Sequence, residues 1–476
     1  MIKIAIIGAG SIVFCKTLML DIFSTAGLGE VEFSLMAPST RRTTHVKNYM
    51  DRVINENKLK AVVNITTDRR EALKGADYVI ATLQVGGTTA FEIDYAIPMR
   101  YGVDQCIGDT LGPGGVFRSL RHIPVMNELA SDMLELCPNA LLLNYVNPNA
   151  IICWALAETG VKFVGLCHGV QTTLDLIAGY TGKPKSEIDF LCAGINHMAW
   201  FLKLSHKGHD LYPILRANFE KPEYYANEKV RGEVFRQFGF FMTESTGHLS
   251  EYLPYFRKNE AVMKLYCDEP GFGGESGAYV NFSKYVGDKY NNQDMLAGEP
   301  TSLGVHSQNE RSVEYGSFII EAIETGKPFV FNGNIRNNGM ITNLPHDCCA
   351  EGPIYADANG LQPMIVGDLP PQCAALNLTN INVQRLTVLA ANNIDTEAIV
   401  HACALDPLTA ASKLSLAEIR SMSSELLEAQ REWLPQFSGK SIRTTPAIHI
   451  PANIERAKVP VDPALKINAR FGELGK

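Results

Sequence analysis

The chain has 476 residues, of which 46% are hydrophobic and 20% are charged, and its formal net charge is −8. This length predicts more than one domain, while the negative charge and the absence of a lysine- and arginine-rich cluster argue against nucleic-acid binding. No apolar run is long enough for a signal peptide or a transmembrane helix, and eleven scattered cysteines are typical of reduced thiols, so we expect a cytoplasmic protein that does not enter a membrane.

A glycine-rich turn follows the first apolar segment. Residues Lys3–Ile7 predict a strand, and Phe14–Phe23 has the apolar spacing of a helix. Between them, Gly8, Gly10 and Ser11 would let the pyrophosphate of a dinucleotide approach the amino end of that helix. The alternative is an ordinary strand-to-helix turn, but the strand before it and the helix after it favour a dinucleotide-binding loop.

The second predicted strand, Val31–Met36, ends without the carboxylate that usually binds the ribose of NAD. Ala37 follows the strand instead. Ser39, Arg41 and Arg42 come next and could bind a 2′-phosphate, so the sequence does not exclude NADP. The alternative is that the two arginines are solvated residues at the start of a helix.

The pattern as a whole predicts a doubly wound, Rossmann-like, mostly parallel sheet in residues 1–198, followed by an α+β substrate- and metal-binding domain in residues 199–436. Residues 437–476 have scattered prolines and little periodicity, which predicts a C-terminal tail. The Gly-, Asn- and Tyr-rich segment Glu269–Pro300 predicts a mobile loop or lid. Arg118–Leu136 predicts an amphipathic crossover helix. Further strands are expected at Val62–Thr66, Asp77–Val85, Leu141–Val146 and Val161–Leu166.

Three loops at the carboxyl ends of these strands carry candidate binding groups. Gly86 lies in the first and could contact the cofactor. Asp109 and Arg118 flank a run of glycines in the second, and Asn147 follows the third strand with an amide that can bind hydroxyls. Because open α/β sheets bind ligands at this edge, we expect the three loops to face one site. A simple turn-forming role for Asp109 is the alternative.

A cysteine and a histidine predict a metal site at the same edge. Cys167 and His168 directly follow the apolar run Phe163–Leu166, and His197 stands in a later Gly-Ile-Asn-His turn. A thiolate and an imidazole suit a borderline-soft divalent cation, and two protein ligands leave positions open for substrate and water. The alternative is a buried cysteine and a structural core histidine.

In their order, the motifs resemble those of the NAD- and manganese-dependent glycosidases of glycoside hydrolase family 4, and within it those that act on α-galactosides. The likeness covers nearly the whole chain, and the chain departs from the family pattern in two places. The tail has no counterpart, and Ala37 replaces the usual Asp. The motifs are IGAGS, DTLGPGG, LNYVNPNA, GLCHGVQ, CAGINHMAW, HLSEYLPYF, NIRNNG, DANGLQP, TNINVQ and DPLTA.

The resemblance implies that Cys167 and His197 hold Mn²⁺ or another divalent cation and that Tyr252 is the catalytic base. His168 stands where members that cleave phosphosugars carry Asp or Asn, which implies an unphosphorylated sugar and a role for this imidazole in protonating the leaving group. Without the resemblance, packing against neighbouring residues would be the simpler role for Tyr252.

The resemblance also implies which residues face the sugar and what reaction they serve. Asp109, Asn147 and Arg336 are expected at the sugar hydroxyls, and Asp109 is expected to be catalytic together with Tyr252 and His168. From its place in the glycine loop, Arg118 is also expected to bind the substrate, and Asn147 is expected near the cofactor as well. The implied reaction hydrolyses an unphosphorylated α-galactoside by oxidation at C3, elimination across C1 and C2, addition of water and return of the hydride; the family is an exception to two-carboxylate catalysis. A homodimer or homotetramer is expected.

Alternative functions stay open at this point. An α-glucosidase or an α-galacturonidase would fit the same family. From the residues alone, a 2-hydroxy-acid dehydrogenase shares the dinucleotide domain but would need no metal, and a nucleotide-binding sensor without catalytic activity would need neither the base nor the metal ligands.

Overall fold

The computed structural model describes residues 1–25, 27–303, 311–460 and 464 of the chain. Residues Met1–Arg443 form one compact unit, and the described residues after Arg443 belong to a separate unit. The predicted tail starts at residue 437, whereas the second unit starts at Thr444, seven residues later. Phe437 is buried and belongs to the first unit. Residues 461–463 and 465–476 of the predicted tail lie outside the described part of the chain.

The first six strands form a parallel half-sheet in the order β3-β2-β1-β4-β5-β6. This is the strand order of a dinucleotide-binding Rossmann fold, so the predicted fold is confirmed. The buried faces of the strands carry the apolar runs seen in the sequence, as a parallel sheet covered on both sides requires. The strands are β1 (Ile2–Ile7), β2 (Val31–Met36), β3 (Ala61–Thr66), β4 (Tyr78–Ala81), β5 (Leu141–Asn144) and β6 (Lys162–Gly165).

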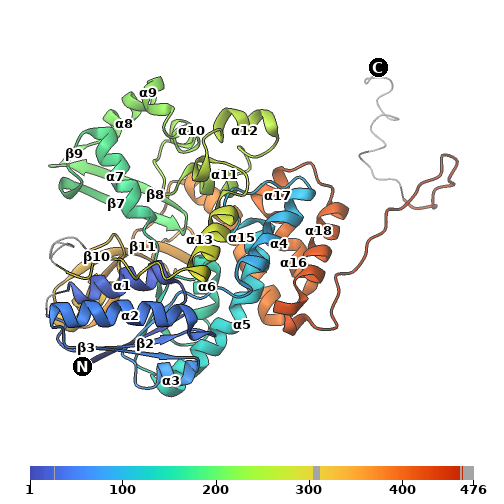
Figure 1. Cartoon of the computed structure of the whole chain (residues 1–476). Coiled ribbons are helices and arrows are strands. Elements are labelled where there is room, and N and C mark those ends of the chain that lie inside the picture. Colours follow the sequence, from blue (N-terminus) through green and yellow to red (C-terminus); the bar gives the residue numbers. More distant parts are fainter. Residues whose placement is uncertain (26, 304–310, 461–463, 465–476) are drawn as a thin grey trace. The chain divides into compact units, whose positions relative to one another are not determined.

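Helices connect these strands and cover the sheet (Figure 1). The predicted crossover helix is the greater part of α5, and its apolar positions from Leu120 to Met133 are buried. The helices of this half are α1 (Ile12–Phe23), α2 (Thr40–Asn57), α3 (Arg69–Leu73), α4 (Gly87–Arg100), α5 (Gly112–Leu136), α6 (Asn149–Leu156) and α7 (Gly169–Thr181).

The sheet continues past β6 with antiparallel strands in the order β10-β11-β7-β8-β9, and β12 pairs with β11. The two halves of the chain therefore share one twelve-stranded sheet. The predicted boundary between residues 198 and 199 falls at the start of β8, inside the β7–β8 hairpin, and the division into two domains stays a prediction. The strands are β7 (Ile188–Ile195), β8 (Met198–His206), β9 (His209–Asp210), β10 (Phe329–Arg336), β11 (Cys349–Asp357) and β12 (Gly360–Pro363).

The segment Glu269–Pro300, expected to be a loop or lid, instead contains a fifteen-residue helix, α13 (Ala278–Asn292). Contacts from outside the segment hold this helix. Lys284 Nζ lies 2.8 Å from the carboxylate of Glu92 on α4, and Arg42 Nε donates a 2.9 Å hydrogen bond to Asn291. Tertiary contacts therefore override the weak helical periodicity of the sequence.

The other helices of the second half include α15, α16 and α18, which pack against one another beside α5 (Figure 1). None of the described helices has the length and apolarity needed to cross a membrane. All eleven cysteines are free, as expected. The remaining helices are α8 (Tyr212–Phe219), α9 (Pro222–Tyr225), α10 (Lys229–Phe238), α11 (Thr246–Tyr252), α12 (Glu260–Tyr266), α14 (Gly316–Thr325), α15 (Pro371–Asn393), α16 (Thr396–Leu405), α17 (Pro407–Ala411) and α18 (Leu416–Ala429), with 3-10 turns at Lys185–Glu187, Gly271–Gly273, Arg431–Trp433 and Pro435–Phe437.

Candidate active site

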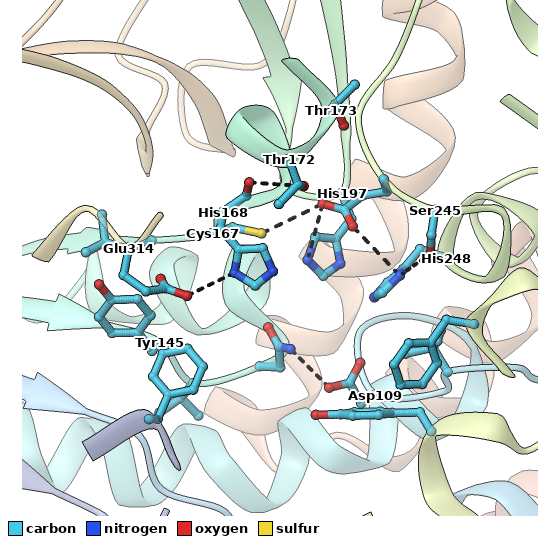
Figure 2. Close-up of a pocket in the computed structure, with 18 of the residues that line it drawn as sticks. Asp109, Tyr145, Cys167, His168, Thr172, Thr173, His197, Ser245, His248 and Glu314 are labelled. Carbon is cyan, nitrogen blue, oxygen red and sulfur yellow. Dashed lines mark hydrogen bonds and ion pairs between the residues drawn. The ribbon is translucent and has the colours of Figure 1, made fainter. Parts of the chain in front are cut away.

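A cavity of about 560 Å³ lies at the carboxyl edge of the parallel strands. Its wall runs from Ser11 after β1 and Thr82 after β4 to Asn147 after β5 and Cys167 after β6. Figure 2 shows side chains from these loops and from the second half of the chain pointing into the same space. The cavity therefore occupies the position where open α/β sheets bind ligands.

The glycine loop closes one end of the cavity. The backbone N–H groups of Gly8 and Ala9 both donate to the carbonyl of Met36, and Gly8 has a φ of +93°. A Cβ on Gly8 would lie 2.5 Å from the backbone nitrogen of Leu83, so only glycine fits at this crossing. Ser11 lies on the cavity wall and α1 begins at Ile12, so the loop stands at a helix amino end, where a diphosphate can bind.

Of the two other residues predicted to contact the cofactor, Asn147 and Gly86, one lines the cavity and the other is not among the described lining residues. Asn147 lines the cavity. Gly86 is not among the described lining residues; it has a φ of +77° at the start of α4, and a Cβ there would press on Ala90 and Trp433. A tight turn and close packing therefore account for the glycine at position 86. Thr82, Leu83 and Gln84, just before it, do line the cavity.

Three candidate metal ligands meet on the wall of the cavity. One ligand atom from each of Cys167, His197 and Glu244 lies within 4.8 Å of the other two. The sulfur of Cys167 is 3.8 Å, and Nε2 of His197 is 3.9 Å, from Oε1 of Glu244. A second imidazole, that of His248, lies beside the carboxylate with Nδ1 at 3.7 Å (Figure 2). The donor set of sulfur, nitrogen and oxygen fits a divalent transition-metal cation.

Local backbone geometry directs these groups together. His197 occupies the β7–β8 turn with a φ of +63°, and Glu244 has a φ of +77°, a conformation that side-chain-bearing residues rarely adopt. The guanidinium of the buried Arg231 on α10 donates to the carbonyl of Glu244. At the start of α7, Gly169 leaves space for the carboxylate, because a Cβ there would collide with Oε1 of Glu244.

Burial and charge set the protonation of the cluster. Burial, with Glu244 and other carboxylates nearby, raises the pKa of the Cys167 thiol well above its usual value, and burial lowers the pKa of His197 to about 4. Burial alone would raise the pKa of Glu244, but His197 and His248 lower it below its usual value. The cluster thus offers a neutral imidazole and a carboxylate, while the thiol must release a proton when it binds a cation.

Asp109 and Asn147 form a polar wall next to the cluster. The Asn147 amide donates a 3.0 Å hydrogen bond to Asp109, and Arg118 Nε donates to the carbonyl of Asn147 at 3.2 Å. Arg118 Nη1 has no hydrogen-bond partner among the described residues. The buried Glu251 on α11 holds the Asp109 loop by accepting hydrogen bonds from three successive backbone N–H groups, those of residues 106–108. This wall presents fixed donors and acceptors to a ligand rich in hydroxyls.

His168 lies on the wall with its side chain 48% exposed. Its Nδ1 is 3.0 Å from Oε1 of Glu314, which precedes α14 and also lines the cavity (Figure 2). The hydrogen bond to Glu314 raises the pKa of His168 above its usual value, against the effect of burial. His168 is therefore suited to carry a proton that faces the cavity.

Tyr252, at the end of α11, is buried directly behind His197. Its hydroxyl lies 3.5 Å from Nδ1 of His197, whereas Nε2 of the same ring faces Glu244. Burial and then the charge of Asp109 raise the pKa of Tyr252 well above 10. The side chain is 1% exposed and is not part of the described lining, so it adjoins the cluster from below the cavity surface.

Arg336, predicted to face the sugar, lies elsewhere. It ends β10, which runs antiparallel to β6 and pairs Asn334 with Gly165. The carboxyl end of β10 therefore points to the amino end of β6, where Arg336 lines a different cavity with Val161 and Lys162. Within one chain, the structure therefore does not bring Arg336 to this site.

Two residues of the site were not found from the sequence. Glu244 and Glu314 lie in loops without periodicity, and each reaches the site from a distant part of the chain. From the sequence alone, His248, Glu251 and Arg257 could form a surface network or belong to the site. In the structure Glu251 and Arg257 are buried, and His248 lines the cavity. In the sequence, the signal that links Glu244 to the site is its spacing from His248, which follows four residues later.

The class of this enzyme is defined by a Rossmann-type sheet whose glycine loop shares a cavity with a thiol–imidazole–carboxylate cluster. Comparison with protein-family models gives the same class. The model for "Family 4 glycosyl hydrolase" matches residues 3–182, and the model for the "Family 4 glycosyl hydrolase C-terminal domain" matches residues 192–409. The chain belongs to glycosyl hydrolase family 4.

The chain is similar to two bacterial α-galactosidases over almost its whole length. That of Rhizobium meliloti (strain 1021) is 41% identical over 446 residues, which cover 92% of this chain and 90% of the relative. That of Bacillus subtilis (strain 168) is 40% identical over 442 residues, which cover 91% and 99%. A solved 6-phospho-α-glucosidase from gut microorganisms, in complex with NAD and Mn²⁺, shares the fold with a TM-score of 0.74 and 20% identity, covering 91% of this chain and 99% of that one.

Proposed function

We propose that the chain hydrolyses unphosphorylated α-galactosides with the help of a bound nicotinamide dinucleotide and a divalent cation, Mn²⁺ or a similar ion. One observation carries the proposal: a single cavity joins the glycine loop at Ser11 to the Cys167–His197–Glu244 cluster. A sugar between the two ends would meet a hydride acceptor on one side and a Lewis acid on the other. The similarity to two α-galactosidases supports the choice of sugar.

The chain's own residues suit both groups. Gly8 and Gly10 would admit the diphosphate, and Ser11 and Asn147 on the cavity wall would contact the bound dinucleotide. Cys167 and His197 would hold the cation, and Glu244 completes the set as a third ligand. When bound, the dinucleotide supplies reversible hydride transfer at C3, and the cation supplies Lewis-acid polarisation and a local positive charge.

Tyr252 is proposed as the base that removes the C2 proton. Its hydroxyl lies 3.5 Å from Nδ1 of His197, next to the proposed cation position, and is close enough to Asp109 for that carboxylate to raise its pKa. A positive charge at the cluster would lower its raised pKa and favour the tyrosinate. His168 is proposed as the proton donor to the leaving group, because its ring faces the cavity and Glu314 fixes its Nδ1.

Asp109, Asn147 and Arg118 are proposed to bind the sugar hydroxyls. Asp109 and Asn147 already hydrogen-bond to each other, so their orientation is fixed before a ligand binds. Arg118 has an unused donor at Nη1. A sugar in this position would replace no internal hydrogen bond of Arg118 and would satisfy its free N–H group.

The charge of the wall favours a neutral sugar. The described lining carries four carboxylates, of Asp109, Glu228, Glu244 and Glu314, and two guanidinium groups, of Arg118 and Arg231. Arg231 is already engaged, because its Nε lies 3.5 Å from the carboxylate of Glu228 and it donates to the carbonyl of Glu244. A phosphorylated sugar or a uronide would find few free cations, so these substrates are expected to react more slowly.

The proposed setting is a homodimer or homotetramer in the cytoplasm. Eleven free cysteines fit a reducing compartment. Ile365 is 83% exposed and Met364 46% exposed, and exposed apolar neighbours of this kind are typical of contacts between subunits. Light scattering on the purified protein measures the assembly, and a monomer at micromolar concentration would contradict this part of the proposal.

The test is hydrolysis of p-nitrophenyl α-galactoside under reducing conditions, with Mn²⁺ and the dinucleotide omitted one at a time. The full mixture is expected to turn over, and each omission is expected to stop it. The α-glucoside, the α-galacturonide and 6-phosphorylated α-galactoside are the comparison substrates. Faster cleavage of any of these would reassign the sugar, and net accumulation of reduced cofactor would favour the dehydrogenase alternative.

A further inference from the structure

No carboxylate follows β2, where the adenosine end of a bound dinucleotide is expected. Ala37 follows β2 beside the glycine loop, where Gly8 and Ala9 donate to the carbonyl of the preceding Met36. In dinucleotide-binding folds a carboxylate at the end of this strand accepts hydrogen bonds from the ribose 2′-hydroxyl, whereas an arginine nearby accommodates a 2′-phosphate. Ala37, which is 5% exposed, offers no acceptor.

Arg42, on the first turns of α2, lies against this loop. A Cβ placed on Gly10 would be 3.9 Å from both the Cβ of Ala37 and the Cδ of Arg42, so the three residues are immediate neighbours. Arg42 Nη1 lies 3.4 Å from the carbonyl oxygen of Gly10. On the other side, Nε donates to Asn291 at 2.9 Å and Nη2 to the carbonyl of Gly287 at 3.3 Å, both on α13. The guanidinium is therefore held in place beside the loop.

Arg42 is not paired with a carboxylate in the part of the chain that the structure describes. All three of its acceptors are neutral, and among the described ion pairs none includes Arg42. Partial burial and the neighbouring Arg41 lower the pKa of Arg42, and no acid opposes this effect. A half-buried, unpaired cation is costly, and an anion bound next to it would be stabilised.

We infer that the adenosine end of the cleft accepts a 2′-phosphate and that the chain binds NADP⁺ more tightly than NAD⁺, with Arg42 as the residue that determines this preference. The inference rests on the proposed function only in assuming that a nicotinamide dinucleotide occupies the cleft. The hydride chemistry at the nicotinamide is the same for both cofactors, so the preference changes binding and not the reaction.

Calorimetric titration of the full chain with two matched pairs of ligands tests the inference without any turnover. The pairs are NAD⁺ with NADP⁺, and 5′-AMP with 2′,5′-ADP, and the members of each differ by the 2′-phosphate. The phosphorylated member is expected to bind at least about tenfold more tightly, since one close charge pair at a partly exposed site contributes on this order. The ratio is expected to fall as salt is raised, because the interaction is ionic.

Substitution assigns the preference to one side chain. Arg42→Gln is expected to abolish the preference for the phosphorylated member, and Ala37→Asp is expected to reverse it. Arg52→Gln is the matched control: Arg52 lies on the same helix and also donates to two backbone carbonyls of a later segment, those of Leu296 and Ala297, but it stands more than two turns farther from the glycine loop. The control is expected to keep the parent ratio.

The outcomes separate this inference from the proposed function. Tighter binding of NAD⁺ and 5′-AMP by the parent chain would overturn the inference and leave the proposed function intact. An unchanged ratio in Arg42→Gln would overturn the role of Arg42. Binding of neither dinucleotide by a folded chain would remove the proposed function itself, and with it the premise of the inference.

Discussion

The carboxylate of Glu244 reaches Cys167 and His197 because of a backbone conformation that the sequence does not reveal. Its φ of +77° is unusual for a residue with a side chain, and Arg231 holds the carbonyl in this arrangement. Cys167 and His197 could be predicted because each stands where a strand ends. Glu244 follows no regular element, so only the folded chain brings its carboxylate to the other two.

Gly169→Ala tests the role of the carboxylate without removing any ligand. A Cβ at this position would collide with Oε1 of Glu244 and push the carboxylate away from Cys167 and His197. The affinity for Mn²⁺, measured by competition with a fluorescent chelator, is expected to fall about 10- to 100-fold, as for disturbed groups around other metal sites.

The same helix offers the control for this change. Gly179 is also on α7, but a Cβ there would meet no atom within 4 Å. Gly179→Ala should therefore keep the parent affinity for Mn²⁺ and should stabilise the helix slightly. If Gly169→Ala bound Mn²⁺ as tightly as Gly179→Ala, Glu244 would not belong to the metal site.

Tyr252→Phe distinguishes a base from a residue that only orients His197. If Tyr252 removes the C2 proton, loss of the hydroxyl should lower kcat by about 10²- to 10⁴-fold while the Mn²⁺ content and the dinucleotide affinity stay unchanged. Metal analysis and calorimetry on the same preparation provide the two control values. A variant that lost its metal along with its activity would show instead that the hydroxyl positions His197 through the 3.5 Å contact with Nδ1.

At the scale of elements, the parallel strands were predictable and α13 was not. The strands are apolar runs bounded by glycine or polar residues, and burial on both faces selects that composition. The helix α13 has few buried residues of its own and depends on Arg42 and Glu92 from distant helices. A segment that is stabilised mainly from outside carries little periodicity.

The position of Arg336 away from the cavity has a topological cause. The strand β10 returns antiparallel beside β6, so its last residue reaches the edge of the sheet opposite the cavity. Strand direction within a mixed sheet depends on long-range pairing, which a single sequence does not specify. The motif around Arg336 was recognisable, but its place in the fold was not.

Helix α5 contains a titratable group whose effect on stability has a definite sign. His122 is fully buried; its Nε2 accepts the backbone N–H of Val85 at 3.1 Å, and its Nδ1 donates to the carbonyl of Arg118 at 2.6 Å. Burial, followed by Arg118 and Arg121, lowers the pKa of His122 well below 6.5. Its burial and its two hydrogen bonds give His122 a structural role.

The free energy of unfolding should therefore fall as the pH drops below about 6.5, the pKa of histidine in an unfolded chain. Below this pH, His122 binds a proton in the unfolded state but stays neutral in the folded state. The stabilisation is therefore fully present above that pH and is lost below it. His197 contributes with the same sign. In His122→Gln, the slope of the unfolding free energy against pH, measured by urea unfolding, should decrease by the equivalent of about one proton at most. Parallel profiles for parent and variant would contradict this.

At the scale of the whole molecule, one sheet runs through both halves of the chain. The main hydrophobic core likewise joins strands and helices from before and after residue 198. We therefore expect residues Met1–Arg443 to unfold in one transition, with coincident curves for circular dichroism and for fluorescence of the three tryptophans. Two separate transitions would support the predicted division into domains at residue 198.

The most direct test of the proposed chemistry is hydrolysis of an α-galactoside in deuterated water, followed by NMR of the released sugar. Oxidation at C3 makes the C2 proton acidic, and a base that removes this proton exchanges it with solvent. The proposed mechanism predicts deuterium at C2 of the product, with no turnover when the dinucleotide or the cation is removed. A product that keeps its original hydrogen at C2, formed at the full rate, would contradict it.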